Sequence, residues 1–263
     1  IESKISSKTK AIVVMHYAGI ACDIPFIRKL CDKYNLFLIE DAALGLGSSL
    51  DGIPLGKWGD FSTFSFHETK NITCGEGGLL VINNEKYHEK SEIIWEKCTN
   101  RSAFLRGEAD KYEWVAKGSS YLTSELHAAV LMAQLESWDD ILFRRAKLWE
   151  NYRNSLLHFE NIILPEVKTN QMINGSLFYF LLPDFEILTA FISEMKKNGI
   201  SVSTHYRCLH KSKWALEHFR TDKLINCEKI SDTLVRLPLY TGLTDPEQNE
   251  VIERTKEFLI KLN

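Results

Sequence analysis

Two apolar runs on either side of an amphipathic segment constrain the fold of this chain most strongly. Residues 11–16 (Ala-Ile-Val-Val-Met-His) and 36–40 have the pattern of strands buried on both faces. Between them, Asp23 and Pro25 open a helical pattern. Strand, helix and strand within about 30 residues form a right-handed βαβ unit, which makes the two strands parallel. The helix is expected to bury one face formed by Phe26, Ile27, Leu30, Cys31 and Tyr34.

The chain then continues with two more strand patterns and a long helix. The strand patterns lie at 61–66 and 78–83, and a helical pattern lies at 86–97. Ser124 is a plausible N-cap for a helix that extends to about Phe159. Its apolar positions, which follow the 3.6-residue period, are Leu126, Ala129, Val130 and Ala133.

The region after Pro165 has the pattern of a smaller α+β unit. Asp245 is expected to cap its last helix, with Pro246 at the first position and Gln248 at the third. The other elements predicted there are strands at 177–182, 202–206 and 234–239 and a helix at 185–198. The predicted domains are a large domain at 1–125, a connecting helix at 126–160 and a small domain at 161–263.

Composition and charge exclude several classes of protein. Hydrophobic residues make up 44% of the chain, which is enough to bury a core and excludes disorder. The apolar runs are far shorter than the about 20 residues of a membrane span. The net charge is −3, without a basic stripe, so no nucleic-acid partner is expected. The chain has six cysteines, at Cys22, Cys31, Cys74, Cys98, Cys208 and Cys227. Their spacing matches no metal-binding motif, so we expect free thiols in a reducing cytoplasm and no metal site.

Candidate chemistry lies at the ends of two predicted strands. Asp41 directly follows the strand at 36–40, and Lys70 follows the strand at 61–66 by four residues. If these strands are neighbours, both side chains open into one crevice at the carboxyl edge of the sheet. A strand-end carboxylate and a loop amine in one pocket suit pyridoxal phosphate (PLP), because the carboxylate keeps the pyridine nitrogen protonated and the amine forms the Schiff base. Ser65 offers a hydroxyl for the phosphate, and residues 75–78 supply a glycine-rich turn.

Each of these features also has a structural explanation. An Asp at a strand end is commonly a turn former, and a Lys in a polar loop is commonly solvated. The residues alone therefore leave the PLP site and a purely structural role about equally supported.

Three segments resemble one enzyme family. Residues 39–43 (Ile-Glu-Asp-Ala-Ala), 65–71 (Ser-Phe-His-Glu-Thr-Lys-Asn) and 75–78 (Gly-Glu-Gly-Gly) are similar to the DegT/DnrJ/StrS family of sugar-nucleotide aminotransferases. Matches at 16–19, 124–129 and 237–240 extend the resemblance over nearly the whole chain. The resemblance implies an α/β fold of the PLP-dependent transferase type (aspartate aminotransferase, type I). It also implies an incomplete large domain, because the usual N-terminal segment with its phosphate-binding turn is missing, and a small α+β C-terminal domain.

Four further segments are similar to one branch of this family, the transaminases that make dTDP-4-amino-4,6-dideoxygalactose. These segments are residues 96–102, 106–107, 110–112 and 118–122. This similarity implies transfer of an amino group from glutamate to the 4-keto carbon of dTDP-4-keto-6-deoxyglucose, for cell-surface polysaccharides. Lys70 would be the Schiff-base lysine, Asp41 the pyridinium partner and Ser65 a phosphate ligand. Family enzymes are homodimers, and Ser120 stands where the family often has an Asn that reaches the partner subunit's phosphate.

One departure from the family pattern concerns the cofactor. Leu44 stands where many relatives have a Gln or His that bonds the cofactor's phenolic oxygen, a loss of about 1 kcal/mol. Two alternatives stay open: a chain that folds and dimerises without activity, and an aminotransferase for another nucleotide keto-sugar. A nucleotide-binding Rossmann enzyme is disfavoured, because no GxGxxG follows a predicted strand.

Overall fold

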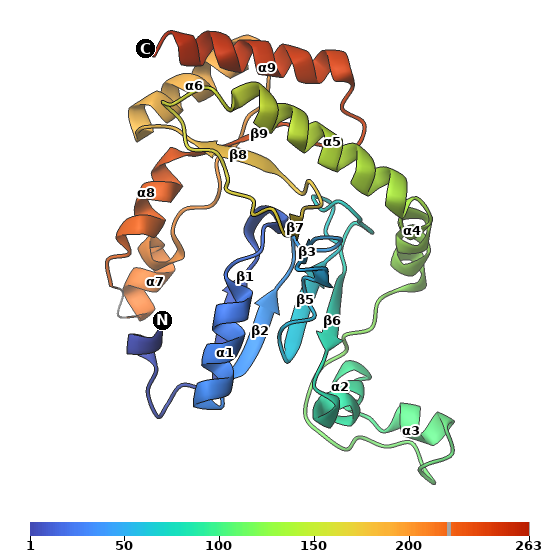
Figure 1. Ribbon diagram of the computed structural model, residues 1–263. Helices are drawn as coiled ribbons and strands as arrows, with labels where there is room; N and C mark the ends of the chain where they lie inside the picture. Colours follow the sequence, from blue (N-terminus) through green and yellow to red (C-terminus); the bar gives the residue numbers. More distant parts are fainter. Residues whose placement is uncertain (220–221, 263) are drawn as a thin grey trace. The chain divides into compact units, whose positions relative to one another are not determined.

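The computed structural model describes residues 1–219 and 222–262. The chain divides into two compact units, coloured along the sequence in Figure 1. The first unit contains Ile1–Asp140 and Asn170–Ile173, and the second contains Ile141–Thr169 and Asn174–Asn263. Among the described residues, none of the helices combines the length and the apolar character that a membrane span requires.

The first unit is built on a four-stranded sheet with the order β1-β2-β5-β6. Its strands are β1 (Ala11–Met15), β2 (Phe37–Asp41), β5 (Phe61–Ser65) and β6 (Gly78–Ile82). The βαβ prediction is confirmed, because β1 and β2 pair in parallel and α1 (Ile24–Tyr34) connects them. Strand β5 extends the parallel pairing, but β6 pairs antiparallel to β5, which a short loop after β5 allows.

Helix α1 packs a narrower apolar stripe than the sequence pattern predicted. Ile24, Ile27, Leu30 and Cys31 are buried, and three of them pack with Val14 and Leu38 in one core cluster. The expectation was wrong for Phe26 and Tyr34, which are 53% and 39% exposed. A helix that covers one side of a sheet buries only the stripe that faces the strands, and these two side chains lie at its margin.

The remaining elements of this unit are short. A three-stranded sheet with the order β4-β3-β7 combines β3 (Ser49–Leu50), β4 (Ile53–Pro54) and β7 (Gln171–Met172), so a segment distant in sequence completes it. The helices are α2 (His88–Trp95), α3 (Arg101–Leu105) and α4 (Glu125–Glu136), with 3₁₀ turns η1 (Glu2–Lys4), η2 (Tyr17–Gly19) and η3 (Glu85–Tyr87).

The long helix predicted after Ser124 forms two helices. Ser124 caps α4 as expected, since its hydroxyl accepts a hydrogen bond from the His127 backbone N–H. Helix α4 ends at Glu136, with Ser137 as its C-cap, and α5 (Trp138–Leu156) follows. The apolar positions that follow the helical period in α4 are not buried: Leu126 is 81% and Val130 50% exposed, and the helix has no buried residue. Periodicity identified the helix but could not show what covers its apolar residues.

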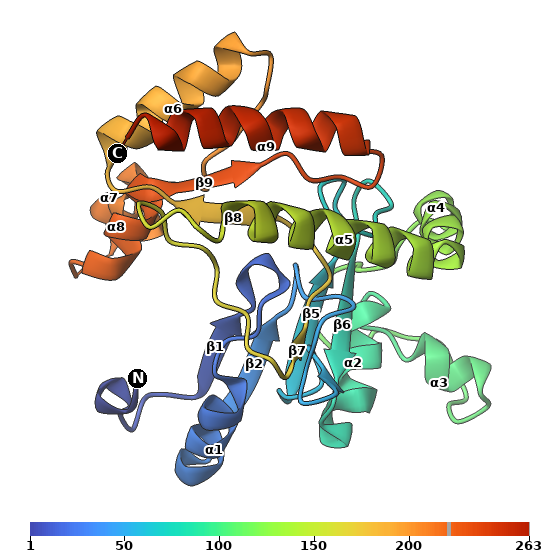
Figure 2. The ribbon, with the colours of Figure 1, turned by 45° about the horizontal axis from the view of Figure 1, so that its top comes forward.

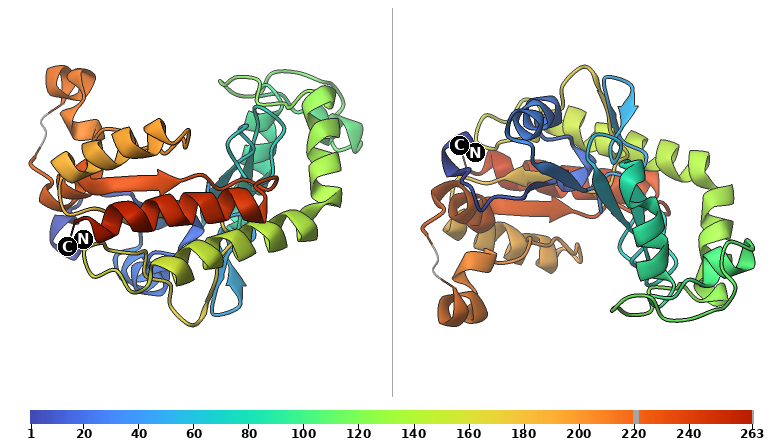
Figure 3. Two further views of the ribbon diagram at one scale, coloured as in Figure 1. Left: turned by 90° about the horizontal axis from the view of Figure 1, so that it is seen from above. Right: turned by 90° about the horizontal axis from the view of Figure 1, so that it is seen from below.

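The second unit packs helices on an antiparallel pair of strands, β8 (Phe178–Leu181) and β9 (Leu234–Leu237). Helices α5, α6 (Phe185–Lys197) and α9 (Asp245–Ile260) lie along this pair in Figures 2 and 3. Aromatic contacts form the core, with Phe178 against Trp149 at 5.5 Å and Phe191 against Phe258 at 5.1 Å between ring centroids. The shorter elements are η4 (Leu209–Lys211), α7 (Lys213–His218) and α8 (Ile225–Thr233).

Two local expectations in this unit are corrected. The strand expected at 202–206 is reduced to an isolated bridge between Ser203 and Arg236. The last helix is capped by Thr244 rather than Asp245: its hydroxyl accepts from the Glu247 N–H, and the Glu247 carboxylate accepts from the Thr244 N–H at 2.8 Å. The capping box is therefore present one residue earlier than predicted.

A buried arginine joins α5 to two loops of the second unit. Arg145 donates to the carbonyl oxygens of Gly175, Ser176 and Leu239 at 2.7–3.2 Å. Its burial lowers the pKa of the guanidinium to about 10. Gly175 lies so close to the Arg145 backbone that a Cβ there would be 2.5 Å from the carbonyl carbon and oxygen. This close approach, with a φ of +60° at Gly175, explains why a glycine occupies the position.

Candidate active site

Asp41 and Ser65 end neighbouring parallel strands of the first unit. Asp41 is the last residue of β2, and its register partner on β5 is Thr63, two residues before Ser65. The carboxyl ends of the two strands therefore meet at the same edge of the sheet, where open α/β sheets bind ligands. Asp41 is half-buried, and its Oδ1 accepts a hydrogen bond of 3.1 Å from the Ala43 N–H. No other hydrogen bond to its carboxylate occurs within the described residues, so Oδ2 is left for a ligand.

Lys70 lies in a tight loop at this edge, residues 66–77, which we call the lysine loop. Phe66 holds its two ends, because its N–H donates to the Gly77 carbonyl and its carbonyl accepts from the Cys74 N–H, both at 2.9 Å. The Lys70 N–H donates to the His67 carbonyl, and the Lys70 side chain is half-buried. A Cβ on Gly77 would lie 2.6 Å from the Cys74 sulfur, so the loop closes this tightly only with glycine.

Ser65 connects β5 to the lysine loop. Its hydroxyl oxygen accepts a hydrogen bond of 3.3 Å from the His67 N–H and is half-buried. The structure therefore places Asp41, Ser65 and the loop that carries Lys70 at the carboxyl ends of β2 and β5. The sequence prediction depended on these two strands being neighbours, and that condition is met.

A fully buried glutamate, for which the sequence pattern indicated no role, supports this edge. Glu40 precedes Asp41 on β2 and is 0% exposed. Burial by itself raises the pKa of Glu40, but hydrogen bonds from His16, Gly59 and Gly56 outweigh it and hold the pKa below its ordinary value. The groups that donate to its two oxygens, at 2.6–3.1 Å, are His16 Nε2, Gly56 N, Trp58 N, Gly59 N and Ser62 Oγ.

The His16 ring also has a defined protonation pattern. Its Nδ1 accepts a hydrogen bond of 3.3 Å from the Cys22 N–H, so this nitrogen carries no proton. Nε2 therefore carries the proton and donates it to Glu40 at 2.9 Å. Since His16 directly follows β1, one carboxylate joins the end of β1, strand β2 and the loop that leads into β5.

Comparison with known proteins identifies the family. The sequence matches the DegT/DnrJ/EryC1/StrS aminotransferase family over residues 1–256. The chain belongs to this family. It is 33% identical over 268 residues to the uncharacterized protein MJ1066 of Methanocaldococcus jannaschii, covering 98% of this chain and 69% of that protein. Among the solved structures, DesV of S. venezuelae is 25% identical with a TM-score of 0.87, covering 98% of this chain and 67% of DesV.

The comparisons also agree with the predicted fold and cofactor. Spr1654 of Streptococcus pneumoniae was solved in a PMP form and a PLP form. Its PMP form has a TM-score of 0.89 and 23% identity, covering 100% of this chain and 72% of Spr1654. The type I fold and the class of PLP-dependent sugar aminotransferase are thus confirmed at the level of the family.

The residues at the sheet edge of this aminotransferase chain fit PLP. A half-buried carboxylate with an open oxygen suits the pyridine nitrogen, and the amine of Lys70 follows on the neighbouring strand's loop. Leu44 lies in the turn after β2 and is half-buried, and its side chain has no polar atom for a cofactor oxygen. Ser120 is not brought into the group: its backbone bridges Glu96, and its exposed hydroxyl has no hydrogen bond within the described residues.

Proposed function

We propose that this chain transfers an amino group from glutamate to the 4-keto carbon of dTDP-4-keto-6-deoxyglucose, using PLP held by Asp41, Ser65 and Lys70. The observation that carries the proposal is the placement of a half-buried Asp and a half-buried Lys at the ends of adjacent parallel strands. PLP, when bound, supplies an electron-accepting ring that stabilises negative charge on the substrate carbon.

Three residues of the chain have separate roles toward the cofactor. The Ala43 N–H holds Asp41 Oδ1 in place, and the carboxylate would keep the ring nitrogen of a bound cofactor protonated. Lys70 would hold the cofactor through its amine and, once the amino donor had displaced that amine, would move a proton at the substrate carbon. Ser65 donates its hydroxyl hydrogen to the phosphate, since the His67 N–H already occupies an acceptor position of its oxygen.

The choice of keto-sugar rests on segment 96–122. The motifs similar to the 4-amino-4,6-dideoxygalactose branch fall within it, and polar contacts give it a defined conformation. Asn100 donates to the Lys111 carbonyl at 2.9 Å and accepts from the Glu113 N–H at 2.8 Å. Arg101 is exposed beside them and lies 3.7 Å from the Glu96 carboxylate, which Lys97 also approaches at 3.5 Å, so the two cations exceed the one anion and leave a positive charge suited to a diphosphate. A panel of nucleotide 4-keto and 3-keto sugars tests this assignment, and equal turnover of all of them would refute it.

A homodimer is part of the proposal. Large apolar side chains remain exposed on β6 and α4, at Leu79, Leu80, Leu126, Val130 and Met132. Exposed large apolar side chains in this number favour burial against another protein surface. In a dimer, Ser120 would reach the partner's cofactor phosphate. Sedimentation of the purified chain should give twice its 30.3 kDa mass, and Leu126→Glu with Val130→Glu should shift it to the monomer. A single-chain mass for the unsubstituted protein would contradict this part.

We also propose that the chain works in the cytoplasm. None of the six cysteines, all of which lie in the described part of the chain, forms a disulfide, which suits a reducing compartment. Location in cells by fractionation tests this, and recovery with an oxidising compartment would contradict it.

Cofactor titration tests the central claim. Added PLP should give an absorbance band of protein-bound cofactor, and Lys70→Ala should abolish it. Lys57→Ala is the matched control, because Lys57 is an exposed lysine of the same unit. Asp41→Asn should keep the band and lower glutamate-dependent turnover by about 100-fold or more, because the ring nitrogen loses its anionic partner.

The competing hypothesis is a folded chain that does not bind PLP tightly, which Leu44 favours. The absence of the band at any PLP concentration, in protein shown to be folded, would establish this alternative and refute the proposal. Recovery of bound cofactor together with turnover would eliminate it.

A further inference from the structure

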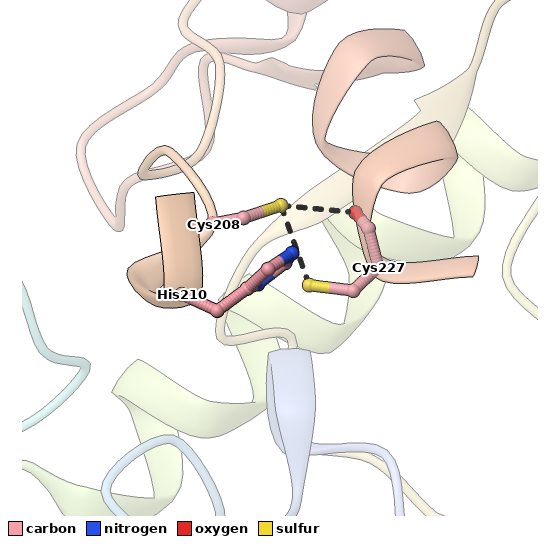
Figure 4. A group of neighbouring side chains, drawn as sticks. All are labelled: Cys208, His210 and Cys227. Atoms are coloured by element: carbon pink, nitrogen blue, oxygen red, sulfur yellow. Dashed lines mark hydrogen bonds between the residues drawn. The ribbon is translucent and has the colours of Figure 1, made fainter. Parts of the chain in front are cut away.

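Two cysteines and a histidine of the second unit form a cluster. Cys208 directly precedes η4, His210 lies within it, and Cys227 lies in α8. The two sulfur atoms are 3.4 Å apart, and Cys208 Sγ also lies 3.4 Å from the Cys227 carbonyl oxygen. One donor atom from each of the three residues lies within 4.8 Å of the other two. Figure 4 shows the imidazole of His210 directed toward the two sulfur atoms.

The spacing of these atoms suits a small tetrahedral cation. With bonds of about 2.0–2.3 Å, the ligand atoms of a zinc site lie about 3.5–3.8 Å apart. Side-chain shifts on the order of 1 Å therefore convert the cluster into a coordination set. Two thiolates and an imidazole are ligands that select Zn²⁺ over Mg²⁺ or Ca²⁺, and two thiolates balance its charge.

A charged neighbour holds the histidine in place. Glu228 Oε1 lies 3.1 Å from His210 Nε2, and the Leu224 N–H donates to the same oxygen at 3.2 Å. Lys211 contacts the other carboxylate oxygen at 3.3 Å. Carboxylates in contact with a metal-binding imidazole orient the ring and increase its affinity for the ion.

The three residues of the cluster differ in burial, so that an ion can reach the cluster from one side. Cys208 is buried and His210 is largely buried, whereas Cys227 is exposed. An ion can therefore enter past Cys227, and water can occupy a fourth position on that side. A disulfide between the two cysteines would use neither His210 nor Glu228, so the histidine and its carboxylate favour a metal site.

We propose that Cys208, His210 and Cys227 bind one Zn²⁺ ion, with Glu228 as a positioning residue and water as the fourth ligand. The ion joins η4 to α8 and so connects two segments that are separated by 19 residues in the sequence. This site is independent of the PLP proposal, because all four residues belong to the second unit and none of them has a role in cofactor binding.

Cobalt provides a direct probe in the full chain. Co²⁺ added to reduced, metal-free protein should give one equivalent of thiolate-to-cobalt absorbance, and Zn²⁺ should displace it. Cys227→Ser should weaken Co²⁺ binding by more than about tenfold without unfolding the chain, because Cys227 is exposed. Glu228→Gln should weaken it about 10-fold or more. Cys22→Ser is the matched control and should bind Co²⁺ like the unsubstituted chain, since Cys22 lies in the first unit.

A second measurement uses the unsubstituted chain alone. Zn²⁺ should slow alkylation of Cys227 in reduced protein, while alkylation of Cys22 should stay unchanged. The proposal is overturned if reduced protein gives no thiolate-to-cobalt band, if Cys227→Ser retains the full band, or if Zn²⁺ leaves the alkylation of Cys227 unchanged.

Discussion

Replacement of Glu40 by Gln tests the central support of the candidate site. The change keeps the size of the side chain but removes its charge and turns one oxygen into an NH₂ group. Glu40 Oε2 accepts from His16 Nε2 and from the Gly56 N–H, both at 2.9 Å. Oε1 accepts from the N–H groups of Trp58 and Gly59 and from a serine hydroxyl. Whichever oxygen becomes NH₂, at least two donors lose their acceptor.

The histidine cannot compensate for this loss. An unprotonated Nε2 would accept from the new NH₂ group, but the proton would then move to Nδ1 and face the Cys22 N–H. Two lost hydrogen bonds to a buried charge cost about 1.5–3 kcal/mol each. We therefore expect Glu40→Gln to lower the free energy of unfolding by about 3–6 kcal/mol. That is a large part of the about 5–15 kcal/mol that stabilises an ordinary protein.

The dependence on pH gives an independent check. Folding lowers the pKa of Glu40, so its ionised form stabilises the folded state above the ordinary glutamate pKa. This stabilisation is lost as the pH falls through the lower pKa of the folded protein. Glu40→Gln has no carboxylate to protonate, so the difference in stability between the two proteins should shrink with acidification.

Urea unfolding followed by tryptophan fluorescence measures both effects. Glu68→Gln is the control, because Glu68 is exposed in the same unit and should change stability by no more than about 0.5 kcal/mol. A cost below about 1 kcal/mol for Glu40→Gln, or a constant difference from neutral pH to pH 3, would refute the role assigned to Glu40.

Two predictions concern the second unit. Gly175→Ala should lower its stability by about 2–4 kcal/mol, because the new Cβ would meet the Arg145 backbone at 2.5 Å and φ is +60°. Gly199→Ala, at a φ of +73° with open space around it, should cost only about 1 kcal/mol, and equal thermal midpoints for the two variants would contradict the steric argument. Thr244→Ala removes the capping box of α9 and should lower the free energy of unfolding in urea by about 1 kcal/mol. Thr244→Ser keeps the hydroxyl and should retain most of the stability. An unchanged unfolding midpoint for Thr244→Ala would show that Glu247 stabilises the helix without the cap.

The βαβ unit could be predicted because its signal is local. Strands β1 and β2 are continuous apolar runs, and a helix with Pro25 at its start lies between them. The sequence did not determine whether β2 and β5 are neighbours; the site prediction was conditional on this, and the pairing of the two strands in the structure meets the condition. The antiparallel direction of β6 was not predicted, since β6 is an apolar run and such a run does not show its direction.

Features that depend on contacts between distant segments could not be predicted. Glu40 stands at the end of an apolar run, and only the folded loop at 56–62 shows that its carboxylate is buried and fully bonded. Cys208 and Cys227 are separated by 19 residues and match no metal-binding spacing, yet η4 and α8 bring their sulfur atoms within 3.4 Å. The sequence did contain one indication of a metal site, because His210 lies two residues after Cys208.

Glu40 and Asp41 lie on opposite faces of β2 and have different roles. Successive side chains of a strand point to opposite faces, so Glu40 lies on the same face as buried Leu38, and Asp41 lies on the other. Glu40 binds His16 after β1 and the loop before β5, which fixes the ends of both neighbours of β2. The distance between Asp41 and the lysine loop depends on these same strand ends. A buried structural carboxylate therefore sets the geometry in which the adjacent carboxylate can meet a cofactor, and an Asp-Ala-Ala motif without the preceding Glu would not be held in this way.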